Sequence, residues 1–298
     1  MRGLLLRFGL NLADLVARSL PRGAAYALAD LGGRAWYRFA PARRALVSES
    51  LARVLAATGP PTTGRALARL VERAFVSHAR YYLEFLRAPH YPDDRIDEIV
   101  RAEDWEHWQQ VMRDGAVVVT AHFGSFEPFG HLVAAHGISG VVPIEEIQPR
   151  ELYEFLLARR AAGRGVEAIP LSRALRRMVE VLRAGGMVAL AADRDLGGDG
   201  IEVQMFGHPT TLPAGPAALS LKTGRPLMLA TCTREAPERF LGRGWSVEAE
   251  LSGDRRADTA ALTRALAARF EEAIALAPEQ WFAIFQPYWS DQRSAEAS

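Results

Sequence analysis

Cysteine, lysine and long apolar stretches are scarce in this chain of 298 residues. Its single cysteine, Cys232, excludes an intramolecular disulfide, and the apolar residues around it predict a buried strand with an inert thiol. No stretch approaches the ~20 consecutive apolar residues that a membrane-spanning helix needs. Lys222 is the only lysine, so nearly all of the positive charge is on arginine. The sequence is therefore not a disulfide scaffold, and it offers no candidate for a spanning helix.

An excess of charge of either sign is also missing. The 36 basic and 35 acidic residues leave a net charge of +1, which gives no reason to propose a nucleic-acid partner. Hydrophobic residues make up 49% of the chain, enough for a large core, so wholesale disorder is excluded. The length fits one large domain, or one domain with an appended helical piece.

The N-terminal segment predicts a basic amphipathic helix. Arg7, Asn11 and Asp14 interrupt its apolar run, which argues against a secretory signal peptide. Residues 1–50 contain eight arginines and three acidic residues, a bias typical of a helix that lies in an anionic membrane surface. An ordinary helix packed on the core, with solvated arginines, is an equal alternative. The apolar face consists of Leu5, Phe8, Leu12, Leu15 and Val16.

The order of the predicted elements indicates a single α/β domain behind a helical region. Residues 1–88 read as helices with breaks at prolines and glycines, and residues 89–298 form the α/β part. There, short apolar runs alternate with helical segments, which predicts a central mixed, largely parallel sheet flanked by helices. The expected strands are 116–121, 140–144, 166–170, 187–192, 226–232 and 245–251. The expected helices are 127–136, 149–162, 172–184, 213–223, 258–277 and 279–287.

A histidine and a glutamate follow the most β-branched of these runs, Ala116-Val-Val-Val-Thr-Ala-His-Phe-Gly-Ser-Phe-Glu127. Open α/β sheets present reactive groups at the carboxyl ends of strands, so His122 can act as a general base. Glu127 is expected to fix the tautomer of this histidine and to stabilise its imidazolium. With Gly124 in the turn, the spacing favours removal of a proton from a hydroxyl, as acyl transfer requires. Purely structural roles, with Ser125 as a helix N-cap, are the alternative.

A second polar block follows the strand expected at 187–192. Asp193, Arg194 and Asp195 are expected at the same sheet edge as His122, with a glycine-rich loop after them. An acidic, glycine-rich loop can bind a divalent cation, but this one lacks the ligand spacing of a calcium loop. An ion network centred on Arg194 is therefore the favoured structural interpretation.

Two further features have simple structural explanations. Thr210 and Thr211 precede a helix expected near Pro213, whose free N–H groups could receive a phosphate, although a capped helix start is the simpler interpretation. His131 and His136 are five residues apart, off a common helix face, and no third ligand is near in sequence. No metal site is predicted.

Five motif blocks follow one another along the α/β part: His122-Phe-Gly-Ser-Phe-Glu127, Ala192-Asp-Arg-Asp-Leu-Gly, Gly200-Ile-Glu-Val-Gln-Met-Phe-Gly-His-Pro, Leu212-Pro-Ala-Gly-Pro-Ala-Ala-Leu-Ser and Pro278-Glu-Gln-Trp-Phe-Ala-Ile-Phe-Gln-Pro-Tyr-Trp. In this combination and order they resemble the bacterial lipid A lauroyl/myristoyl acyltransferase family, and within it the phosphatidylinositol mannoside acyltransferase branch. The resemblance covers nearly the whole chain, including the helical N-terminal region. It implies a glycerolipid-acyltransferase-like α/β domain.

The resemblance also implies a role for each candidate residue. In such enzymes the histidine deprotonates the acceptor hydroxyl and an acidic residue supports it, which corresponds here to His122 and Glu127. A second acidic residue assists from the loop after the next strand, and Glu145 and Glu146 both fit it. Substrate-binding residues are expected at Arg159, Arg160 or Arg164 for the phosphates of the donor, and at Ser125, Asp193, Arg194, Asp195 and Glu202 around the acceptor or thioester.

The activity implied is transfer of a fatty acyl group from acyl-CoA or acyl carrier protein to a hydroxyl of a glycolipid, at an anionic membrane surface. Ser125 stands where these enzymes often carry asparagine. Arg194 stands where lipid A enzymes commonly carry glutamine, which favours a glycolipid other than lipid A. The resemblance implies a phosphatidylinositol-mannoside-like acceptor. No resident cofactor is implied, and no acyl-enzyme, because neither Ser125 nor Cys232 lies in a nucleophile elbow.

The resemblance implies a peripheral protein on the cytoplasmic face of the inner membrane. A lipid A acyltransferase, an acyl-thioester hydrolase and a catalytically silent lipid-binding scaffold are the alternatives.

Overall fold

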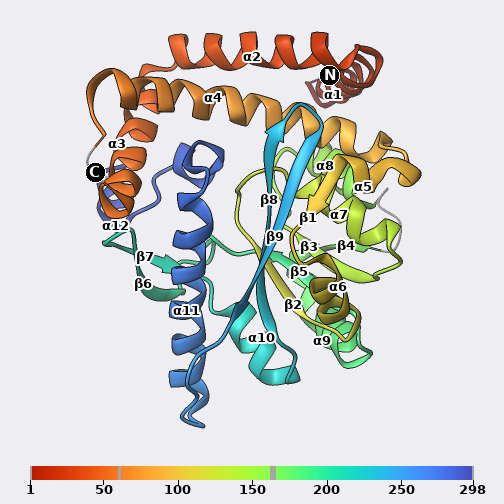
Figure 1. Ribbon diagram of the computed structural model, residues 1–298, viewed down its shortest axis with the longest axis vertical. Helices are drawn as coiled ribbons and strands as arrows, with labels where there is room; N and C mark the ends of the chain where they lie inside the picture. Colours follow the sequence, from red (N-terminus) through yellow and green to blue (C-terminus); the bar gives the residue numbers. More distant parts are fainter. Residues whose placement is uncertain (1, 60–61, 162–165, 297–298) are drawn as a thin grey trace.

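A seven-stranded mixed sheet forms the centre of the computed structural model, which describes residues 2–59, 62–161 and 166–296 (Figure 1). The strands are β1 (Val100–Ala102), β2 (Val117–Thr120), β3 (Gly140–Ile144), β4 (Val166–Pro170), β5 (Met187–Ala191), β6 (Ile201–Met205), β7 (His208–Leu212), β8 (Leu227–Ala236) and β9 (Arg239–Val247). The order in the sheet is β1-β9-β8-β2-β5-β3-β4, and its pairs are parallel except for the β8–β9 hairpin. β6 and β7 form a separate antiparallel hairpin.

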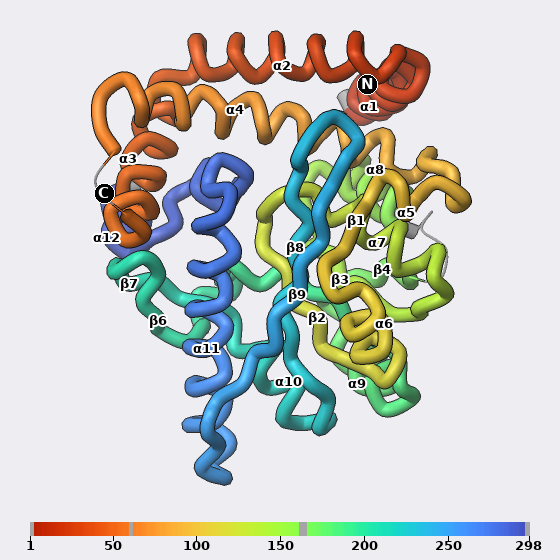
Figure 2. The backbone as a smooth tube through the Cα atoms, in the orientation of Figure 1, coloured from red at the N-terminus to blue at the C-terminus, as the bar shows by residue number. Residues whose placement is uncertain are grey.

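Helices cover both faces of this sheet and form an N-terminal layer beside it (Figure 1). The α-helices are α1 (Arg2–Ser19), α2 (Arg22–Phe39), α3 (Pro41–Thr58), α4 (Gly64–Arg87), α5 (Ile96–Ile99), α6 (Trp105–Arg113), α7 (Phe126–Ala135), α8 (Arg150–Ala161), α9 (Ala174–Arg183), α10 (Gly215–Thr223), α11 (Arg255–Ala275) and α12 (Ser290–Glu296), and two 3-10 turns are η4 (Pro278–Gln280) and η5 (Ala283–Phe285). α2 packs along α4, and α12 lies beside α3, where Arg53 pairs with Asp291 at 2.5 Å (Figure 2). Within the described ranges, no helix combines the length and the hydropathy needed to cross a bilayer.

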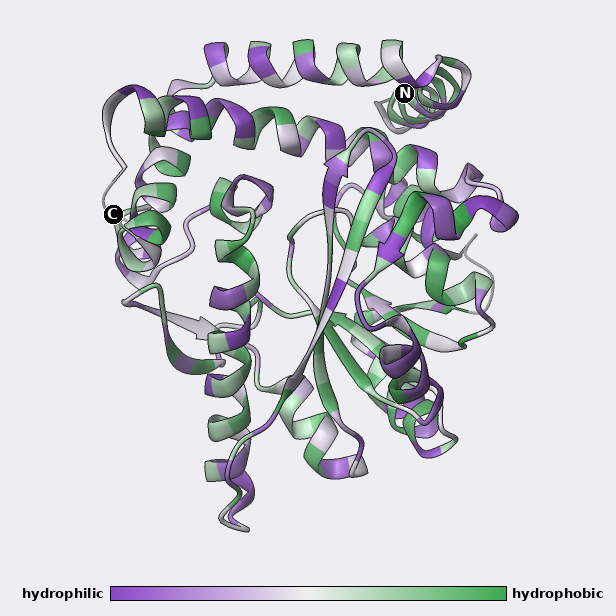
Figure 3. Ribbon diagram, in the orientation of Figure 1, coloured by the Kyte–Doolittle hydropathy of each residue, from purple (hydrophilic) through white to green (hydrophobic). Residues whose placement is uncertain are grey.

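The alternation of side chains along β2 decides which helices meet each face of the sheet. Val117 and Val119 point to one face, where they join the main core with α9, α10 and α11. Val118 points to the opposite face and packs in a second cluster with Met112 of α6 and Val133 of α7. Figure 3 shows apolar residues concentrated in these central strands, as expected for parallel strands covered on both faces.

The architecture confirms the predicted α/β domain with a mixed, largely parallel sheet and a helical N-terminal region. The six predicted strands correspond to β2, β3, β4, β5, β8 and β9, although β9 ends at Val247 and not near residue 251. β1 and the β6–β7 hairpin have no predicted counterpart. The alternation of Ile201, Val203 and Met205 is the local signal that indicates β6. The division of the chain at residue 88 stays a prediction.

Two other expectations about helices are wrong. Residues 279–287 form the turns η4 and η5 in place of an α-helix, because the backbone between these turns bonds to the loop after β2. Thr210 and Thr211 lie inside β7, and α10 begins only at Gly215, so these threonines do not form an anion site at a helix start. Thr210 instead donates its hydroxyl to the carbonyl oxygen of Tyr288 at 2.8 Å.

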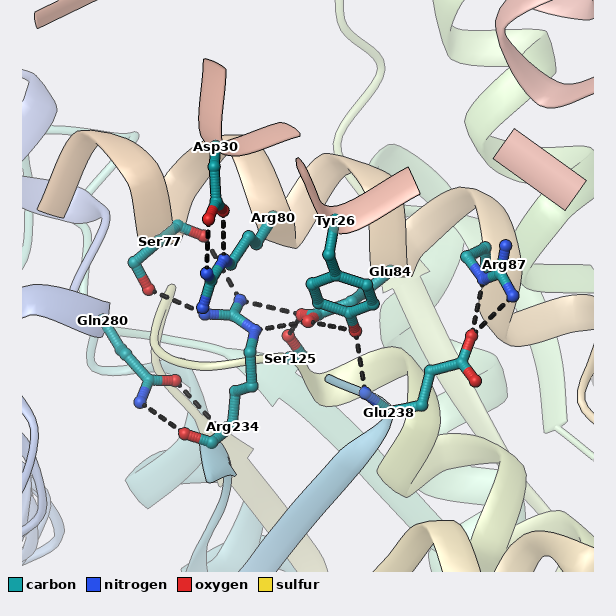
Figure 4. Close-up of polar contacts among 10 residues, drawn as sticks. All are labelled: Tyr26, Asp30, Ser77, Arg80, Glu84, Arg87, Ser125, Arg234, Glu238 and Gln280. Atoms are coloured by element: carbon teal, nitrogen blue, oxygen red, sulfur yellow. Dashed lines mark hydrogen bonds and ion pairs between the residues drawn. The ribbon is translucent and has the colours of Figure 1, made fainter. Parts of the chain in front are cut away.

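A buried ion pair connects the helical layer to the sheet. Arg234 of β8 and Glu84 of α4 bond through two pairs of atoms, one of them Nη2 and Oε2 at 2.8 Å (Figure 4). Their side chains are 4% and 0% exposed. Arg234 also donates to the hydroxyl and the carbonyl oxygen of Ser77 on α4, at 3.0 and 3.2 Å. Because removing a charge from water costs several kcal/mol, such extensive pairing is what makes this position tolerable.

The same cluster holds three other segments. Tyr26 of α2 donates to Glu84 Oε1 at 2.8 Å, and burial together with Glu84 raises the pKa of this tyrosine. Ser125, in the loop between β2 and α7, donates to the other oxygen of Glu84. The Gln280 side chain bonds both backbone groups of Arg234, at 2.9 and 3.0 Å (Figure 4). The helical layer, β8, the loop after β2 and the C-terminal segment therefore meet at one buried point.

We expect Arg234→Met to lower the free energy of unfolding by about 3–5 kcal/mol, because the Glu84 carboxylate stays buried without its counter-charge. Denaturant titration followed by circular dichroism measures this change. The control is the double variant Glu84→Leu/Arg234→Met, which buries no charge and should be more stable than Arg234→Met alone. A loss below ~1 kcal/mol in Arg234→Met, the size typical of an exposed pair, would contradict this description of the cluster.

Candidate active site

The loop after β2 has a conformation that requires glycine at one position. Gly124 has a φ of +67°, and a Cβ there would overlap the carbonyl oxygen of Cys232 on β8. The same carbonyl oxygen accepts from the N–H of Ser125 at 2.7 Å. This close approach fixes the backbone directly after His122 against a central strand.

The C-terminal segment holds the same loop from another side. The carbonyl oxygen of His122 accepts from the N–H of Phe282 at 2.7 Å. The N–H of Gly124 donates to the carbonyl oxygen of Gln280 at 2.9 Å. The position of His122 is therefore determined by backbone hydrogen bonds from two segments that are distant in the sequence.

His122 pairs with a buried aspartate. Its Nδ1 lies 2.7 Å from Oδ1 of Asp193, and Oδ2 of Asp193 accepts from the indole N–H of Trp281 at 3.0 Å. Burial alone would raise the pKa of Asp193, but the imidazole and these hydrogen bonds outweigh it and lower the pKa. Burial also disfavours the imidazolium, yet the Asp193 carboxylate raises the pKa of His122 above its ordinary value. The carboxylate thus stabilises a proton on the histidine.

Strand register explains this pairing. β2 and β5 are parallel neighbours in which Thr120 lies opposite Ala191. His122 and Asp193 each follow two residues later, so they leave the sheet side by side at its carboxyl edge. The equal spacing from two predicted strand ends is a signal that could have identified Asp193 as the partner of His122. The spacing of residues within the His122 motif alone does not indicate this partner.

Glu127 lies in a different environment from the one expected. Its Oε1 accepts from the Tyr81 hydroxyl at 3.2 Å and from Arg160 at 3.4 Å, while the orienting contact on His122 is made by Asp193. The expectation that Glu127 fixes the tautomer of His122 is therefore corrected, because the start of α7 directs Glu127 toward α4 and α8. Burial raises the pKa of Glu127 even though Arg160 opposes this. Its Oε2 is buried without a hydrogen-bond partner among the described residues.

An apolar cavity of about 370 Å³ lies between the sheet and α7. His122, Glu127 and Arg160 line it where the strands reach their carboxyl ends, and most of its other walls are apolar side chains. Cys232 also lines it, but burial raises the pKa of the thiol, which therefore stays protonated. This size and chemistry are typical of a pocket for an apolar ligand.

A second cavity, of about 310 Å³, also reaches His122 and shares Phe126 with the first. His78 lines it and stacks with Tyr82 and Phe282, with ring centroids 5.0 and 4.5 Å apart. Burial lowers the pKa of His78 to about 3, so this ring is neutral and offers a flat face. The other aromatic and charged groups in the wall are Trp36, Tyr81, Phe285, Arg43 and Arg194.

Some of the predicted site residues lie in these walls. Arg159, Arg160 and Glu145 line the first cavity, and Arg194 lines the second. Glu146 is exposed and accepts from the N–H of Ser172 at 3.3 Å. Of the two glutamates that the sequence left open, Glu145 is thus the one in a cavity wall. Within the described residues, no group of three or more His, Cys, Asp or Glu side chains is placed to hold a metal ion.

Three other predicted binding residues, Ser125, Asp195 and Glu202, line neither cavity. Ser125 is fully buried, and its hydroxyl bonds to Glu84 in place of capping α7. Asp195 accepts from two backbone N–H groups of its own glycine-rich loop at 3.0 Å; burial would raise its pKa, but these bonds lower it. Glu202 is exposed on β6. Arg164 lies outside the described residues. The substrate contacts expected from these residues stay predictions.

Several residues of the site have no counterpart among the predictions. Trp281 fixes Asp193, Tyr81 bonds to Glu127, and His78 lines the second cavity. Tyr81 and His78 lie on α4, which the sequence assigns to a separate helical region. Local sequence patterns carry no signal that these residues reach the loop after β2.

Comparison with known proteins gives an independent view of the chain. The sequence model described as bacterial lipid A biosynthesis acyltransferase matches residues 7–290. Phosphatidylinositol mannoside acyltransferase of Mycobacterium tuberculosis, strains CDC 1551 / Oshkosh and ATCC 25618 / H37Rv, is 32% identical over 296 residues, covering 95% of this chain and 89% of that protein. Phosphatidylinositol mannoside acyltransferase of Mycolicibacterium smegmatis is 34% identical over 238 residues, covering 76% of this chain and 75% of that protein.

Proposed function

Because this chain belongs to the bacterial lipid A biosynthesis acyltransferase family, and is therefore an acyltransferase, we propose that it moves a fatty acyl group from acyl-CoA or acyl carrier protein to a hydroxyl of a glycolipid. The names of its relatives favour a phosphatidylinositol-mannoside-like acceptor. One observation carries the proposal: His122, paired with the buried Asp193, reaches both an apolar cavity and an aromatic cavity that bears arginines.

Each cavity suits one substrate. The apolar cavity suits the hydrocarbon chain of the donor, which gains about 0.8 kcal/mol for each methylene removed from water. The second cavity offers flat rings for the faces of sugars and the guanidinium groups of Arg43 and Arg194 for a phosphate. A thioester entering from the first and a hydroxyl entering from the second meet at His122, which lines both cavities.

The proposed reaction starts from the tautomer of His122. Because Nδ1 faces the Asp193 carboxylate, Nδ1 carries the proton and Nε2 is the base. Nε2 takes the proton of the acceptor hydroxyl while the hydroxyl oxygen attacks the thioester carbonyl carbon. The tetrahedral intermediate then collapses, the C–S bond breaks, and the imidazolium returns its proton to the leaving sulfur. The products are an ester and a free thiol, and Asp193 stabilises the imidazolium between the two steps.

In this proposal Arg160 binds the donor, and Glu127 positions Arg160. The Arg160 guanidinium is held by Glu127 and lies 5.3 Å from the centroid of the Phe126 ring, in the wall of the apolar cavity. A cation fixed in a partly dry site stabilises negative charge more strongly than one in water. We assign Arg160 to the thioester oxygen or to a phosphate of the donor, and Glu127 to the position of Arg160.

An exposed apolar surface supports action at a membrane. The predicted apolar face of α1 is not packed on the core: Leu5 is 64% and Phe8 is 68% exposed. α2 adds Leu31 and Phe39, which are 64% and 79% exposed. Arginines interleave with these residues, and a surface of this kind binds anionic lipids. The proposal therefore includes peripheral attachment to the cytoplasmic face of the inner membrane, where the glycolipid would be reached.

Removing the base tests the proposed chemistry. His122→Ala is expected to lower kcat by ~10³-fold, because no other group takes the hydroxyl proton. The assay follows thiol release from acyl-CoA with phosphatidylinositol mannoside in vesicles. His107→Ala, at an exposed histidine on α6, is the matched control and should leave the rate unchanged. Turnover near that of the unmodified protein in His122→Ala would remove His122 from the mechanism.

The Asp193 carboxylate should set the pH dependence of the rate. The base must be neutral, so kcat/KM falls as the pH drops through the pKa of His122, which the Asp193 carboxylate raises above its ordinary value. Asp193→Asn removes the cause of this rise, and burial then lowers the pKa, so the acidic limb moves to lower pH. The maximal rate also falls, by at least ~10²-fold, because the tautomer is no longer fixed. An acidic limb at the same pH in both proteins would show that Asp193 does not act through His122.

Membrane attachment should depend on the apolar face of α1. Replacing Leu5, Phe8 and Leu12 with glutamine is expected to lower binding to vesicles that contain anionic phospholipid by at least ~10-fold, because each side chain loses its burial in lipid. Vesicle flotation measures the bound fraction. Unchanged flotation would rule out α1 as the contact. The control carries the same substitution at three leucines that are similarly exposed elsewhere, Leu175, Leu251 and Leu276.

A further inference from the structure

The apolar cavity extends along the strands from one edge of the sheet to the other. On β5, Met187, Ala189, Leu190 and Ala191 line it, and these include both the first and the last residue of the strand. At ~3.3 Å per residue, that stretch is roughly 13 Å long. Val118 and Thr120 line it in the same way on β2. The cavity is thus a slot under α7 and not a pocket confined to the catalytic edge.

Small residues keep this slot open on the sheet side. Ala189 of β5, Ala168 of β4 and Ala230 of β8 line the cavity at positions where the helix-covered face of a parallel sheet usually carries larger branched side chains. The opposite face of the same sheet is filled, as Val117 and Val119 show. The space under α7 therefore comes from side-chain size, not from a gap between the elements.

Gly130 keeps the slot open on the helix side. It lies in the middle of α7 and lines the cavity. A Cβ built on Gly130 meets no heavy atom of the described residues within 4 Å, so neither a close backbone approach nor its conformation explains a glycine here. Glycine inside a helix costs about 0.8–1.0 kcal/mol relative to alanine. A residue that destabilises its helix and faces empty space is explained if a ligand occupies that space.

Two methionines close the far end. Met187 begins β5, and Met112 lies at the end of α6, just before β2, so both are at the edge of the sheet opposite His122. They line the cavity and are 4% and 0% exposed. A Cβ on Gly140 of the neighbouring β3 would lie 2.5 Å from Cγ of Met187, so the backbone of β3 lies directly against this side chain. The slot therefore has a defined floor.

We infer that these residues set the length of the acyl chain: Gly130 admits the chain past the middle of α7, and Met112 and Met187 stop it. This inference rests on the proposed function, because it assigns the apolar cavity to the acyl group. It goes further by naming the residues that determine chain-length specificity. None of the three is in contact with the reacting atoms, so they change which donor is used and not how the ester forms.

Opposite substitutions should move the preference in opposite directions. Met112→Ala removes three heavy atoms from the floor and is expected to lengthen the preferred chain by about two carbons. Gly130→Leu places a branched side chain across the slot and is expected to shorten the preferred chain by at least about two carbons. The measurement is a competition among saturated even-numbered acyl-CoA thioesters from octanoyl to eicosanoyl, with phosphatidylinositol mannoside in vesicles as acceptor and products read by mass spectrometry.

Matched controls separate specificity from general damage. Met205→Ala creates the same cavity at a fully buried methionine in the main core, away from the slot. Gly32→Leu makes the same change at an exposed mid-helix glycine of α2 that also has no neighbour within 4 Å. Neither control should change the preferred chain length. Gly130→Ala is a milder variant that should raise the melting temperature through helix propensity and still disfavour the longest chains.

A binding measurement distinguishes failure of this inference from failure of the proposed function. Saturated fatty acids from octanoic to eicosanoic acid are added to the full chain, and the melting temperature is recorded for each protein. A stabilisation maximum that moves with Met112→Ala and Gly130→Leu, as the products do, supports the inference. If the unmodified protein transfers acyl groups but neither variant moves its preference, the inference is overturned and the function stands. If no fatty acid stabilises the unmodified protein and no ester forms, both are overturned.

Discussion

The buried pair of Glu84 and Arg234 is the contact on which the arrangement of the site depends. It joins α4 to β8 in the protein interior, and through Ser125 the same carboxylate holds the loop that carries His122. α4 also supplies His78 and Tyr81, which lie in the wall of the second cavity. The N-terminal helices are thus part of the site and not an appendage to it. A charged pair without solvent is stable only when its geometry is kept, so this cluster constrains both cavities at once.

The two cavities meet because residues that follow the end of β2 line both of them. β2 is a central strand, and the loop after it carries His122 to the edge of the sheet beside Asp193, which follows β5 by the same number of residues. The face of β2 that carries Val118 and Thr120 lines the slot, while the face with Val117 and Val119 is filled with core. The same strands therefore provide stability on one side and room for a chain on the other. Under the proposed function, that division places the thioester beside His122.

Much of this arrangement could be predicted from the sequence. The rest could not, because it depends on contacts between segments that are distant in the chain. Apolar runs bounded by turn residues identify the buried central strands, so most of the sheet and the position of His122 were predictable, whereas the β6–β7 hairpin outside this sheet was not. Asp193 was placed at the correct edge but not as the partner of His122, because pairing depends on which strands are neighbours. Glu84 and Arg234 are 150 residues apart, and no local pattern connects them. The cavities could not be predicted either, because the sequence does not show whether an alanine faces a filled core or an open slot.

The central claim is that His122 delivers an acyl group to a hydroxyl and not to water. The direct measurement uses the purified protein with acyl-CoA and vesicles that contain phosphatidylinositol mannoside, and it quantifies thiol, acylated glycolipid and free fatty acid in the same reaction. If His122 acts as proposed, thiol and acylated glycolipid form in equal amounts, and almost no thiol forms when the glycolipid is left out. Free fatty acid released at the same rate with and without the glycolipid would contradict this claim.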